Sequence, residues 1–349
     1  MDIETRIQNC IDAIVAWYPA VRRPLPWREN VTPYRVWISE IMLQQTRIET
    51  VIPYYARFLA AFPDPRSLAE AEEDRLLKLW EGLGYYSRAR NLKKAAQQIT
   101  AAYGGELPRT AAALRTLPGI GDYTAGAIAS IAWGEPEPAV DGNVLRVLAR
   151  VLASGEDVML PRTRADMTAL LRRHYPAGAR AALATEGLME LGETLCAPNT
   201  PPDCARCPLQ ALCLAHEAGS AERFPVRTPP KARRVEERTV LLLCCGGRWA
   251  VRRREERGLL AGLWEFPNVS GCLDEAAARE AVRRMGGEPL ACEPCGAARH
   301  LFTHIEWHMT GYILPLKAEI TGLVWESAEQ LRASYSIPTA LKAYLKKIE

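Results

Sequence analysis

A group of four cysteines just past the middle of the chain is the strongest constraint in the sequence. The stretch CAPNTPPDCARCPLQALC spaces them as C-x7-C-x2-C-x5-C. Thiolates this close together in a reducing compartment hold either zinc or a 4Fe-4S cluster. Two C-x2-C knuckles would favour zinc, but only one pair here has that spacing, and a chance grouping of structural cysteines is the remaining alternative. The expected ligands are Cys196, Cys204, Cys207 and Cys213.

The spacing of apolar residues divides the 349 residues of the chain into a helical part and a part with both helices and strands. Up to about residue 215, apolar residues recur at helical spacing in segments such as PYRVWISEIMLQQT and GNVLRVLARVL, with Pro and Gly between the segments. Further along, short β-type runs such as TVLLLCC and TGYILPL surround a helical segment, LDEAAAREAVRRM. We therefore expect an all-α domain over residues 1–218 that includes the cysteine loop 196–213, a Pro-rich charged linker over 219–236, and an α+β domain over 237–349.

The composition is that of an ordinary globular protein, with 48% hydrophobic and 24% charged residues. No segment reaches the roughly 18 uninterrupted apolar residues that a membrane helix needs, and the stretch MDIETRIQNC carries acids where a signal peptide would not. We expect a cytoplasmic protein. Its net charge of +3 permits binding to a polyanion but does not argue for it.

The segment LRTLPGIGDYTAGAIAS, residues 114–130, has the features of a helix-hairpin-helix. Gly119 and Gly121 flank one apolar residue before a helix that is expected to start near Thr124, so both glycines should allow a sharp turn. Outward-facing amides at the start of that helix would bind a phosphate oxygen without regard to base sequence. A plain glycine turn between two packed helices is the alternative, and the paired glycines favour DNA binding.

Glu40 stands out because its helical neighbours are mostly apolar. In VWISEIMLQQT, the residues three and four positions away are Val36, Trp37, Leu43 and Gln44. Desolvation among these groups should raise the pKa of the Glu40 carboxyl, and a protonated carboxyl at neutral pH can serve as a general acid. The alternative, a glutamate on a solvated helix face, is disfavoured by the apolar flanks.

Asp141 precedes the strongly periodic helix in AVDGNVLRVLARVL. On this segment alone, an N-cap or first-turn acid is the favoured interpretation. A buried carboxylate at this corner could instead stabilise a cation that forms during a reaction. A second carboxyl group nearby, such as that of Glu40, would favour that role.

Aromatic, amide and basic residues gather near these positions and could form a surface that stacks on bases and holds phosphates. Each of them taken alone is explained equally well by packing. They are Trp27, Arg28, Gln44, Gln45, Tyr85, Tyr86, Arg88 and Arg90.

Together these motifs resemble the adenine DNA glycosylases, the MutY family of the endonuclease III superfamily. The similar stretches run from about residue 20 to 215 and are LPWR, TPYRVWISEIMLQQT, LWEGLGYYSRARNLKKAAQQI, LPGIGDYTAGAI, VDGNVLRVLARV and MELGETLC with the cysteine group. GLLAGLWEFPN and RHLFTHIEWHM look like the family's Nudix-like domain. The resemblance implies a helical fold with a cleft, a 4Fe-4S cluster on the cysteines with zinc as the alternative, and a lesion-recognition domain on the C-terminal side.

The reaction that the resemblance implies is removal of adenine mispaired with 8-oxoguanine or guanine in double-stranded DNA, after base flipping, in base excision repair. By resemblance, Glu40 is the acid that protonates adenine at N7, and Asp141 stabilises the oxocarbenium sugar. Tyr123 and Asn143 resemble residues that line the same pocket. We expect a monomer that binds no membrane and is associated with the nucleoid.

Further positions match family residues that contact the DNA. Arg28 and Glu186 match contacts to the adenine. Gln45 and Tyr85 match residues that are inserted into the duplex beside the lesion. These roles rest on the resemblance and are expectations about this chain.

The Nudix-like part departs from a working Nudix hydrolase. The segment GCLDEAAAREAVRRMGG has Arg283 and Arg284 where metal-binding glutamates would be expected, so we do not expect nucleotide hydrolysis. The family senses 8-oxoguanine with Phe-Ser-His, and here Thr303 and His304 follow Phe302, so the hydroxyl is kept and a methyl is added. Without the first domain, an ordinary strand with alternating Phe and His would be the favoured interpretation of this segment.

Two more departures bear on chemistry and on the metal. Bifunctional relatives carry a Lys at the position of Tyr123, where it forms a Schiff base, and a tyrosine cannot do so. We therefore expect a glycosylase without strong lyase activity. The family spacing of the first two cysteines is shorter by one residue, and the Pro-rich loop between Cys196 and Cys204 could bulge to absorb the difference.

Two alternative functions remain open at this point. One is an endonuclease III-like glycosylase/lyase acting on oxidised pyrimidines, which Tyr123 and the Nudix-like extension disfavour. The other is a non-catalytic, cluster-bearing DNA-binding protein. The joint presence of Glu40 and Asp141 argues against the latter, because binding alone requires neither carboxyl group.

Overall fold

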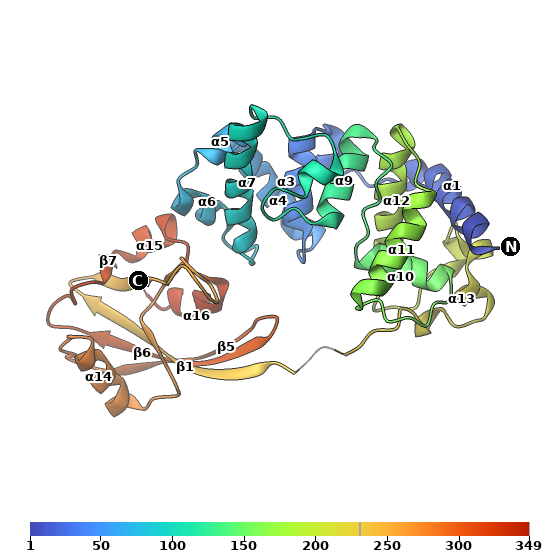
Figure 1. Cartoon of the computed structure of the whole chain (residues 1–349). Helices are drawn as coiled ribbons and strands as arrows, with labels where there is room; N and C mark the ends of the chain where they lie inside the picture. Colours follow the sequence, from blue (N-terminus) through green and yellow to red (C-terminus); the bar gives the residue numbers. More distant parts are fainter. Residues whose placement is uncertain (230–231, 349) are drawn as a thin grey trace. The chain divides into compact units, whose positions relative to one another are not determined.

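The computed structural model describes residues 1–229 and 232–348 (Figure 1), so residues 230 and 231 of the expected linker, together with residue 349, lie outside the described part. The chain forms two compact units. The first comprises Met1–Ala71 and Arg90–Pro229, and the second comprises Glu72–Ala89 and residues from 230 onward.

The first unit is built of helices, several of which begin at a cap. α1 (Ile3–Val21) follows Asp2, whose side chain accepts the Thr5 amide at 2.9 Å. α3 (Pro33–Leu43) follows Thr32, whose hydroxyl accepts the Arg35 amide at 3.2 Å, and it starts at a proline. The remaining helices are α2 (Pro26–Glu29), α4 (Ile48–Ala61), α5 (Pro65–Ala69), α8 (Ala111–Leu114), α9 (Asp122–Trp133), α10 (Gly142–Val151), α11 (Pro161–Arg173), α12 (Ala179–Thr194) and α13 (Leu214–Glu217), with 3-10 turns η1 (Cys204–Arg206), η2 (Gln210–Leu212) and η3 (Ala221–Arg223). α7 (Ser87–Tyr103) begins in the second unit's short segment and continues into the first.

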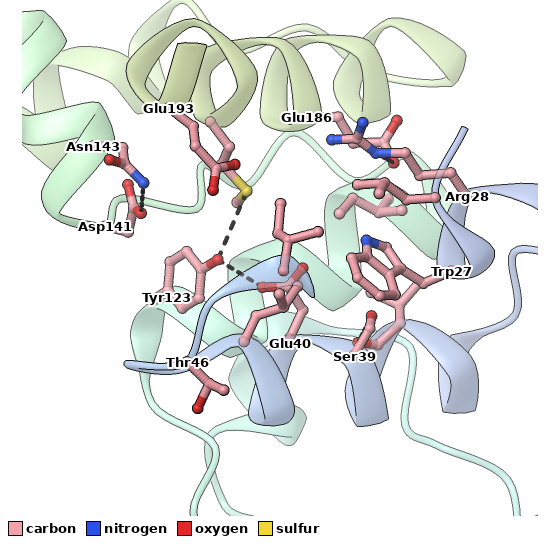
Figure 2. Close-up of a pocket in the computed structure, with 16 residues that line it drawn as sticks. Trp27, Arg28, Ser39, Glu40, Thr46, Tyr123, Asp141, Asn143, Glu186 and Glu193 are labelled. Carbon is pink, nitrogen blue, oxygen red and sulfur yellow. Dashed lines mark hydrogen bonds and ion pairs between the residues drawn. The ribbon is translucent and has the colours of Figure 1, made fainter. Parts of the chain in front are cut away.

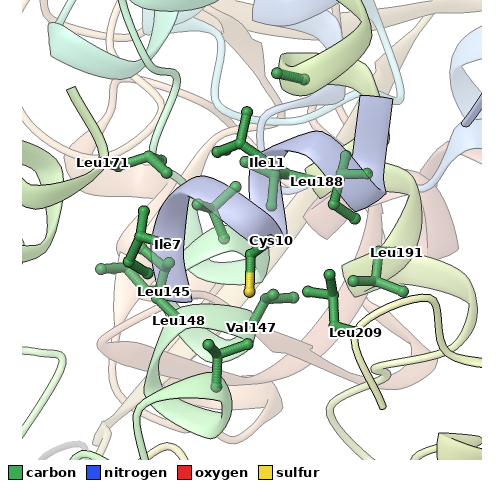
Figure 3. Close-up of a cluster of buried hydrophobic side chains, with 14 of the residues drawn as sticks. Ile7, Cys10, Ile11, Leu145, Val147, Leu148, Leu171, Leu188, Leu191 and Leu209 are labelled. Carbon is green, nitrogen blue, oxygen red and sulfur yellow. The ribbon is translucent and has the colours of Figure 1, made fainter. Parts of the chain in front are cut away.

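An aliphatic core joins α1, α10 and α12 (Figure 3). Ile7 and Ile11 recur at four-residue spacing on α1, and they belong to one buried cluster with Leu145 of α10 and Leu188 of α12. Each fully buried side chain of this size stabilises the fold by about 1.5–3 kcal/mol. Two of the cysteines, at 196 and 207, pack half-buried against the same cluster. The cysteine loop is therefore attached to the helices that form this core.

The second unit contains a mixed seven-stranded sheet within its described residues. Its central pair is parallel, with β1 (Arg234–Cys245) in register with β6 (Ile305–Pro315). The order across the sheet is β3-β2-β1-β6-β5, while β4 pairs with β1 and β7 pairs with β2. The other strands are β2 (Arg248–Arg253), β3 (Trp264–Glu265), β4 (Asn268–Ser270), β5 (Glu293–Leu301) and β7 (Val324–Glu326), and the helices are α6 (Glu73–Trp80), α14 (Glu275–Arg284), α15 (Ala328–Ser334), η4 (Thr339–Leu341) and α16 (Lys342–Leu345).

Helices cover both faces of this sheet, which explains the nearly continuous apolar run of β1. Successive side chains of a strand point to opposite faces. Val240 and Leu242 accordingly join a cluster that includes residues of α15 and α16, whereas Leu241 and Leu243 join a cluster that includes Val282 of α14. A strand buried on both sides needs apolar residues at every position rather than at alternate ones.

The observed architecture confirms the expected order of an all-α part followed by an α+β part. The segment LDEAAAREAVRRM forms α14 as expected. β1 begins at Arg234, inside the stretch expected to be linker, because its backbone pairs with β6 from that residue onward. Among the described helices, none combines the length and the apolar character that crossing a membrane requires.

Candidate active site

A cavity of about 140 Å³ in the first unit collects six residues for which the resemblance implies a role in catalysis or adenine binding (Figure 2). It lies among α2, α3, α9, the start of α10, and α12. These six residues are Arg28, Glu40, Tyr123, Asp141, Asn143 and Glu186. The rest of the lining is Leu25, Trp27, Val36, Ser39, Leu43, Thr46, Ile48, Ile131, Met189 and Glu193.

Glu40 extends from α3 into this pocket and is buried, with 6% of the residue exposed. Burial raises the pKa of its carboxyl to about 7, and the charges of Asp141 and Glu186 add to the rise. The Tyr123 hydroxyl donates to Glu40 Oε2 at 2.6 Å and partly opposes the rise (Figure 2). Near neutral pH, this carboxyl is therefore divided between its protonated and ionised forms, which suits proton transfer.

Tyr123 lies in the first turn of α9 and serves as a neutral donor. Burial raises its pKa well above the usual range, and the neighbouring carboxyl groups of Glu40 and Asp141 add to the effect. Its hydroxyl also lies 3.7 Å from the sulfur of Met189. No lysine is among the residues that line the pocket in the described part of the chain.

Asp141 fulfils the cap role that the sequence favoured, and it also lines the pocket. It is the N-cap of α10, and its Oδ1 accepts the Val144 amide at 2.8 Å. Its Oδ2 accepts the Asn143 side-chain amide at 2.8 Å (Figure 2). Burial raises the pKa of Asp141, while these hydrogen bonds oppose that rise. The cap contacts therefore hold a buried carboxyl group in a fixed orientation at the pocket.

Arg146 connects this carboxyl to the cysteine loop. Its Nη2 donates to Asn143 Oδ1 at 2.8 Å and to the Gly192 carbonyl at 2.6 Å. Its Nε donates to the Cys196 carbonyl at 2.8 Å. A single buried guanidinium thus orients the amide that binds Asp141 and also the backbone of the first cysteine. Sequence reasoning missed Arg146, although a basic residue in the apolar pattern of GNVLRVLARVL was a usable signal.

Arg28 and Glu186 face each other across one side of the pocket. The Arg28 Nε lies 3.7 Å from Glu186 Oε1, and Arg22 Nη2 lies 3.6 Å from Glu186 Oε2. Burial raises the pKa of Glu186, and the two arginines oppose the rise. Sequence reasoning missed three further α12 residues near here, Met189, Glu190 and Glu193. With Glu186 they are spaced along one helical face, a signal present in the sequence EGLMELGE.

The residues expected to contact the duplex lie outside the pocket lining. Gln45 in the first unit and Tyr85 in the second are both exposed and both have left-handed backbone, with φ of 58° and 46°. Thr303 and His304 are exposed in the second unit, and Tyr85 Oη lies 3.1 Å from Thr303 Oγ1 within that unit. The interpretation of Phe302–His304 as plain strand is wrong, because β5 ends at residue 301 and these residues form the turn before β6.

A side chain would be excluded at only one of the two hairpin glycines. Gly119 has φ of 78°, and a Cβ there would lie 2.7 Å from Asn91 Cβ. The expectation that Gly121 also needs to be glycine for the turn is wrong. It caps α9 in extended backbone with φ of −93°, and a Cβ there would meet nothing within 4 Å. The helix starts at Asp122, slightly earlier than expected.

The four cysteines line a second cavity, whose lining includes the residues just after the C-terminal end of α12. Arg150 Nη1 donates to Cys196 Sγ at 3.0 Å and provides positive charge beside the sulfurs. The Asp203 amide donates to the Leu195 carbonyl at 2.9 Å, which closes the loop that carries the additional residue. Among the described residues, no three His, Cys, Asp or Glu side chains converge as a set for one metal ion. The donors are thiols arranged around a cavity, which suits a cluster whose irons each take a separate sulfur.

Comparisons with known proteins agree with this geometry. Residues 38–173 match the family profile of the HhH-GPD superfamily base excision DNA repair protein, and residues 239–347 match the NUDIX domain. The adenine DNA glycosylase of Rattus norvegicus is 34% identical over 401 residues, with 96% of this chain and 77% of that protein covered. The Homo sapiens enzyme of the same name is also 34% identical, with 95% and 72% covered. The one from Buchnera aphidicola subsp. Acyrthosiphon pisum is 31% identical, with 87% and 85% covered.

Solved structures of DNA repair enzymes resemble the helical part of the chain. A thermostable thymine-DNA glycosylase superposes with a TM-score of 0.56 at 28% identity, covering 61% of this chain and 98% of that one. Endonuclease III in a non-covalent DNA complex gives a TM-score of 0.53 at 24% identity over 63% of this chain and 99% of that one, a similarity of fold alone. The identity to relatives across both parts of the chain is what decides the family. This chain belongs to the adenine DNA glycosylase family.

Proposed function

We propose that this protein removes adenine mispaired with 8-oxoguanine, or with guanine, from double-stranded DNA by hydrolysing the N-glycosidic bond. One observation carries the proposal. A carboxyl with a pKa of about 7, Glu40, and a second buried carboxyl, Asp141, line the same pocket. The names of the relatives, adenine DNA glycosylase, support adenine as the base.

In the first step, protonated Glu40 transfers its proton to N7 of the flipped adenine. The C1′–N9 bond then breaks, and its electron pair leaves with the base. Tyr123 favours the ionised product of this transfer, because its hydroxyl donates to Glu40 Oε2 at 2.6 Å. A general acid of this kind accelerates such a reaction by about 10²- to 10⁴-fold.

The sugar left behind carries positive charge on C1′ and the ring oxygen. The Asp141 carboxylate, oriented by the Val144 and Asn143 donors, opposes that charge without having to reorganise. Water then adds to C1′ and gives its proton to the ionised Glu40 carboxylate. The products are free adenine, an abasic site and an enzyme in its starting protonation state.

The proposed enzyme is monofunctional, because Tyr123 stands at the position where lyase relatives carry their lysine. Single-turnover excision assays test this on duplexes with adenine opposite 8-oxoguanine, guanine or thymine, and on a duplex with an oxidised pyrimidine. We expect adenine release from the two mispairs and no strand cleavage. Release of the oxidised pyrimidine, together with an efficient borohydride-trapped complex, would instead identify the endonuclease III-like lyase.

We also propose that Cys196, Cys204, Cys207 and Cys213 hold a 4Fe-4S cluster, with zinc as the alternative. When bound, such a cluster supplies a rigid attachment for the loop between α12 and α13, and no step of the reaction passes through it. Arg150 and Arg146 hold the loop through the Cys196 sulfur and carbonyl. Visible absorbance and iron analysis of the purified protein distinguish the two metals, because zinc is colourless.

The C-terminal domain, residues 237–349, is proposed to recognise the lesion. Thr303 and His304 are exposed in a turn and carry the hydrogen-bonding groups for this task. In the first unit, Gly119 and Gly121 are proposed to present backbone amides to phosphates. Gln45 of the first unit and Tyr85 of the second are proposed to enter the duplex. Thr303→Ala should lower the ratio of excision opposite 8-oxoguanine to excision opposite guanine, whereas Thr303→Ser should keep it.

A further inference from the structure

Glu190 is a buried carboxylate next to the pocket but outside its lining. It lies on α12, one turn after Glu186, and only 1% of the residue is exposed. Two arginines neutralise it. Arg23 pairs with Glu190 through Nε and also donates from Nη2 at 3.2 Å, and Arg28 Nη2 donates at 2.8 Å. A carboxylate this deeply buried needs such partners, and removing its charge changes what those partners can bind.

Arg28 therefore lies between two carboxylates that it contacts unequally. Its contact with Glu190 is a direct hydrogen bond at 2.8 Å, whereas Glu186 is 3.7 Å away. A further hydrogen bond from Nη1 to the Arg23 carbonyl at 3.3 Å holds the guanidinium on the Glu190 side. Both arginines near Glu186, Arg28 and Arg22, stay beyond hydrogen-bond distance from it, at 3.7 and 3.6 Å. In Figure 2, Arg28 and Glu186 lie side by side at the pocket.

We propose that Glu190 is a positioning residue that sets the preference for a base with an exocyclic amine. By holding Arg28, it leaves a Glu186 oxygen available to accept a hydrogen bond from the amine of a base in the pocket. Without the Glu190 charge, Arg28 would turn to Glu186, the remaining carboxylate beside it, and occupy that acceptor. This inference rests on the proposed function and names which of its residues sets specificity.

The test compares single-turnover excision of adenine with excision of purine, which lacks the amine, each placed opposite 8-oxoguanine. Glu190→Gln should lower the adenine-to-purine rate ratio by about 10- to 100-fold, the factor that one hydrogen bond to a charged acceptor provides. Glu190→Asp, which keeps the charge, should restore part of the ratio. An unchanged adenine-to-purine ratio would overturn the proposal, even if both rates fall, because a purely structural role slows excision of both bases alike.

Glu137→Gln is the matched control. Glu137 is also a partly buried carboxylate held by two arginines, Arg115 and Arg172, each at 2.6 Å, but it lies outside the pocket lining. Its loss should leave the ratio unchanged. A double-mutant cycle gives a second test, because Glu190→Gln should lower the ratio no further once Glu186→Gln is present. If wild type releases no adenine at all, the proposed function itself fails, which is a different result from an unchanged ratio.

Discussion

Removing the Tyr123 hydroxyl should shift the pH dependence of base excision upward. Tyr123 donates to the Glu40 carboxyl at 2.6 Å, and this hydrogen bond stabilises the ionised form. Tyr123→Phe therefore raises the pKa of Glu40 above its present value of about 7. A hydrogen bond to a charged group is worth about 1.5–3 kcal/mol, which corresponds to about one to two pH units.

The assay is single-turnover excision of adenine opposite 8-oxoguanine, measured from pH 5 to about pH 9. The rate should follow the protonated fraction of Glu40, so wild type falls to about one-tenth of its plateau at one pH unit above its midpoint. In Tyr123→Phe, the midpoint of this fall should lie about one to two pH units higher, whatever the plateau rate. The midpoint is the quantity to compare, since Tyr123 also shapes the pocket.

Tyr175→Phe is the matched control for this experiment. Tyr175 is buried, and its hydroxyl hydrogen-bonds Thr185 Oγ1 at 2.6 Å, away from the pocket lining. Its variant loses the same atom and should keep the wild-type midpoint. A Tyr123→Phe midpoint that is unchanged, or that moves to lower pH, would refute the assignment of Glu40 as the acid whose pKa this hydroxyl lowers.

Three further outcomes follow from the same contacts. Because burial raises the pKa of Glu40 from 4.5 to about 7, its protonated form is favoured in the folded state, and the resulting stability is lost as pH rises through that interval. The free energy of unfolding of Glu40→Gln, relative to that of wild type, should therefore rise by about 3 kcal/mol between pH 4 and pH 8. A difference in unfolding free energy that does not depend on pH would contradict this. Gly119→Ala should weaken DNA binding at all salt concentrations because its φ of 78° and its close neighbour exclude a side chain, while Gly121→Ala, in open extended backbone, should bind like wild type; equal affinities would count against the hairpin geometry. Arg146→Met should both slow excision and lower the iron content after gel filtration, because the Cys196 carbonyl loses its donor; a variant normal in both respects would show that the connection is dispensable.

Local sequence was enough to predict the features that depend on neighbours in the same helix. Val36, Trp37 and Leu43 lie three or four positions from Glu40 on α3, so its burial could be inferred from their spacing. Asp141 was identifiable as a cap because a cap needs only the helix that follows it. The alternation of helices and strands likewise indicated the fold class.

Contacts between distant segments could not be inferred in this way. Arg28 meets Glu190 across 162 positions, and Arg146 meets Cys196 across 50. Each of these pairs exists only because separate helices pack together, and no local pattern encodes that packing. A local motif can also predict too much. The paired glycines indicated a left-handed turn at both positions, and only Gly119 has positive φ.

The most direct test of Glu40 as the general acid is adenine release by wild type and by Glu40→Gln from a duplex with adenine opposite 8-oxoguanine. Gln keeps the size of the side chain but has no acidic proton to transfer to the base. We expect wild type to release adenine and the variant to release it about 10²- to 10⁴-fold more slowly while still binding the duplex. A variant as fast as wild type, or a wild type that releases no adenine, would contradict this expectation.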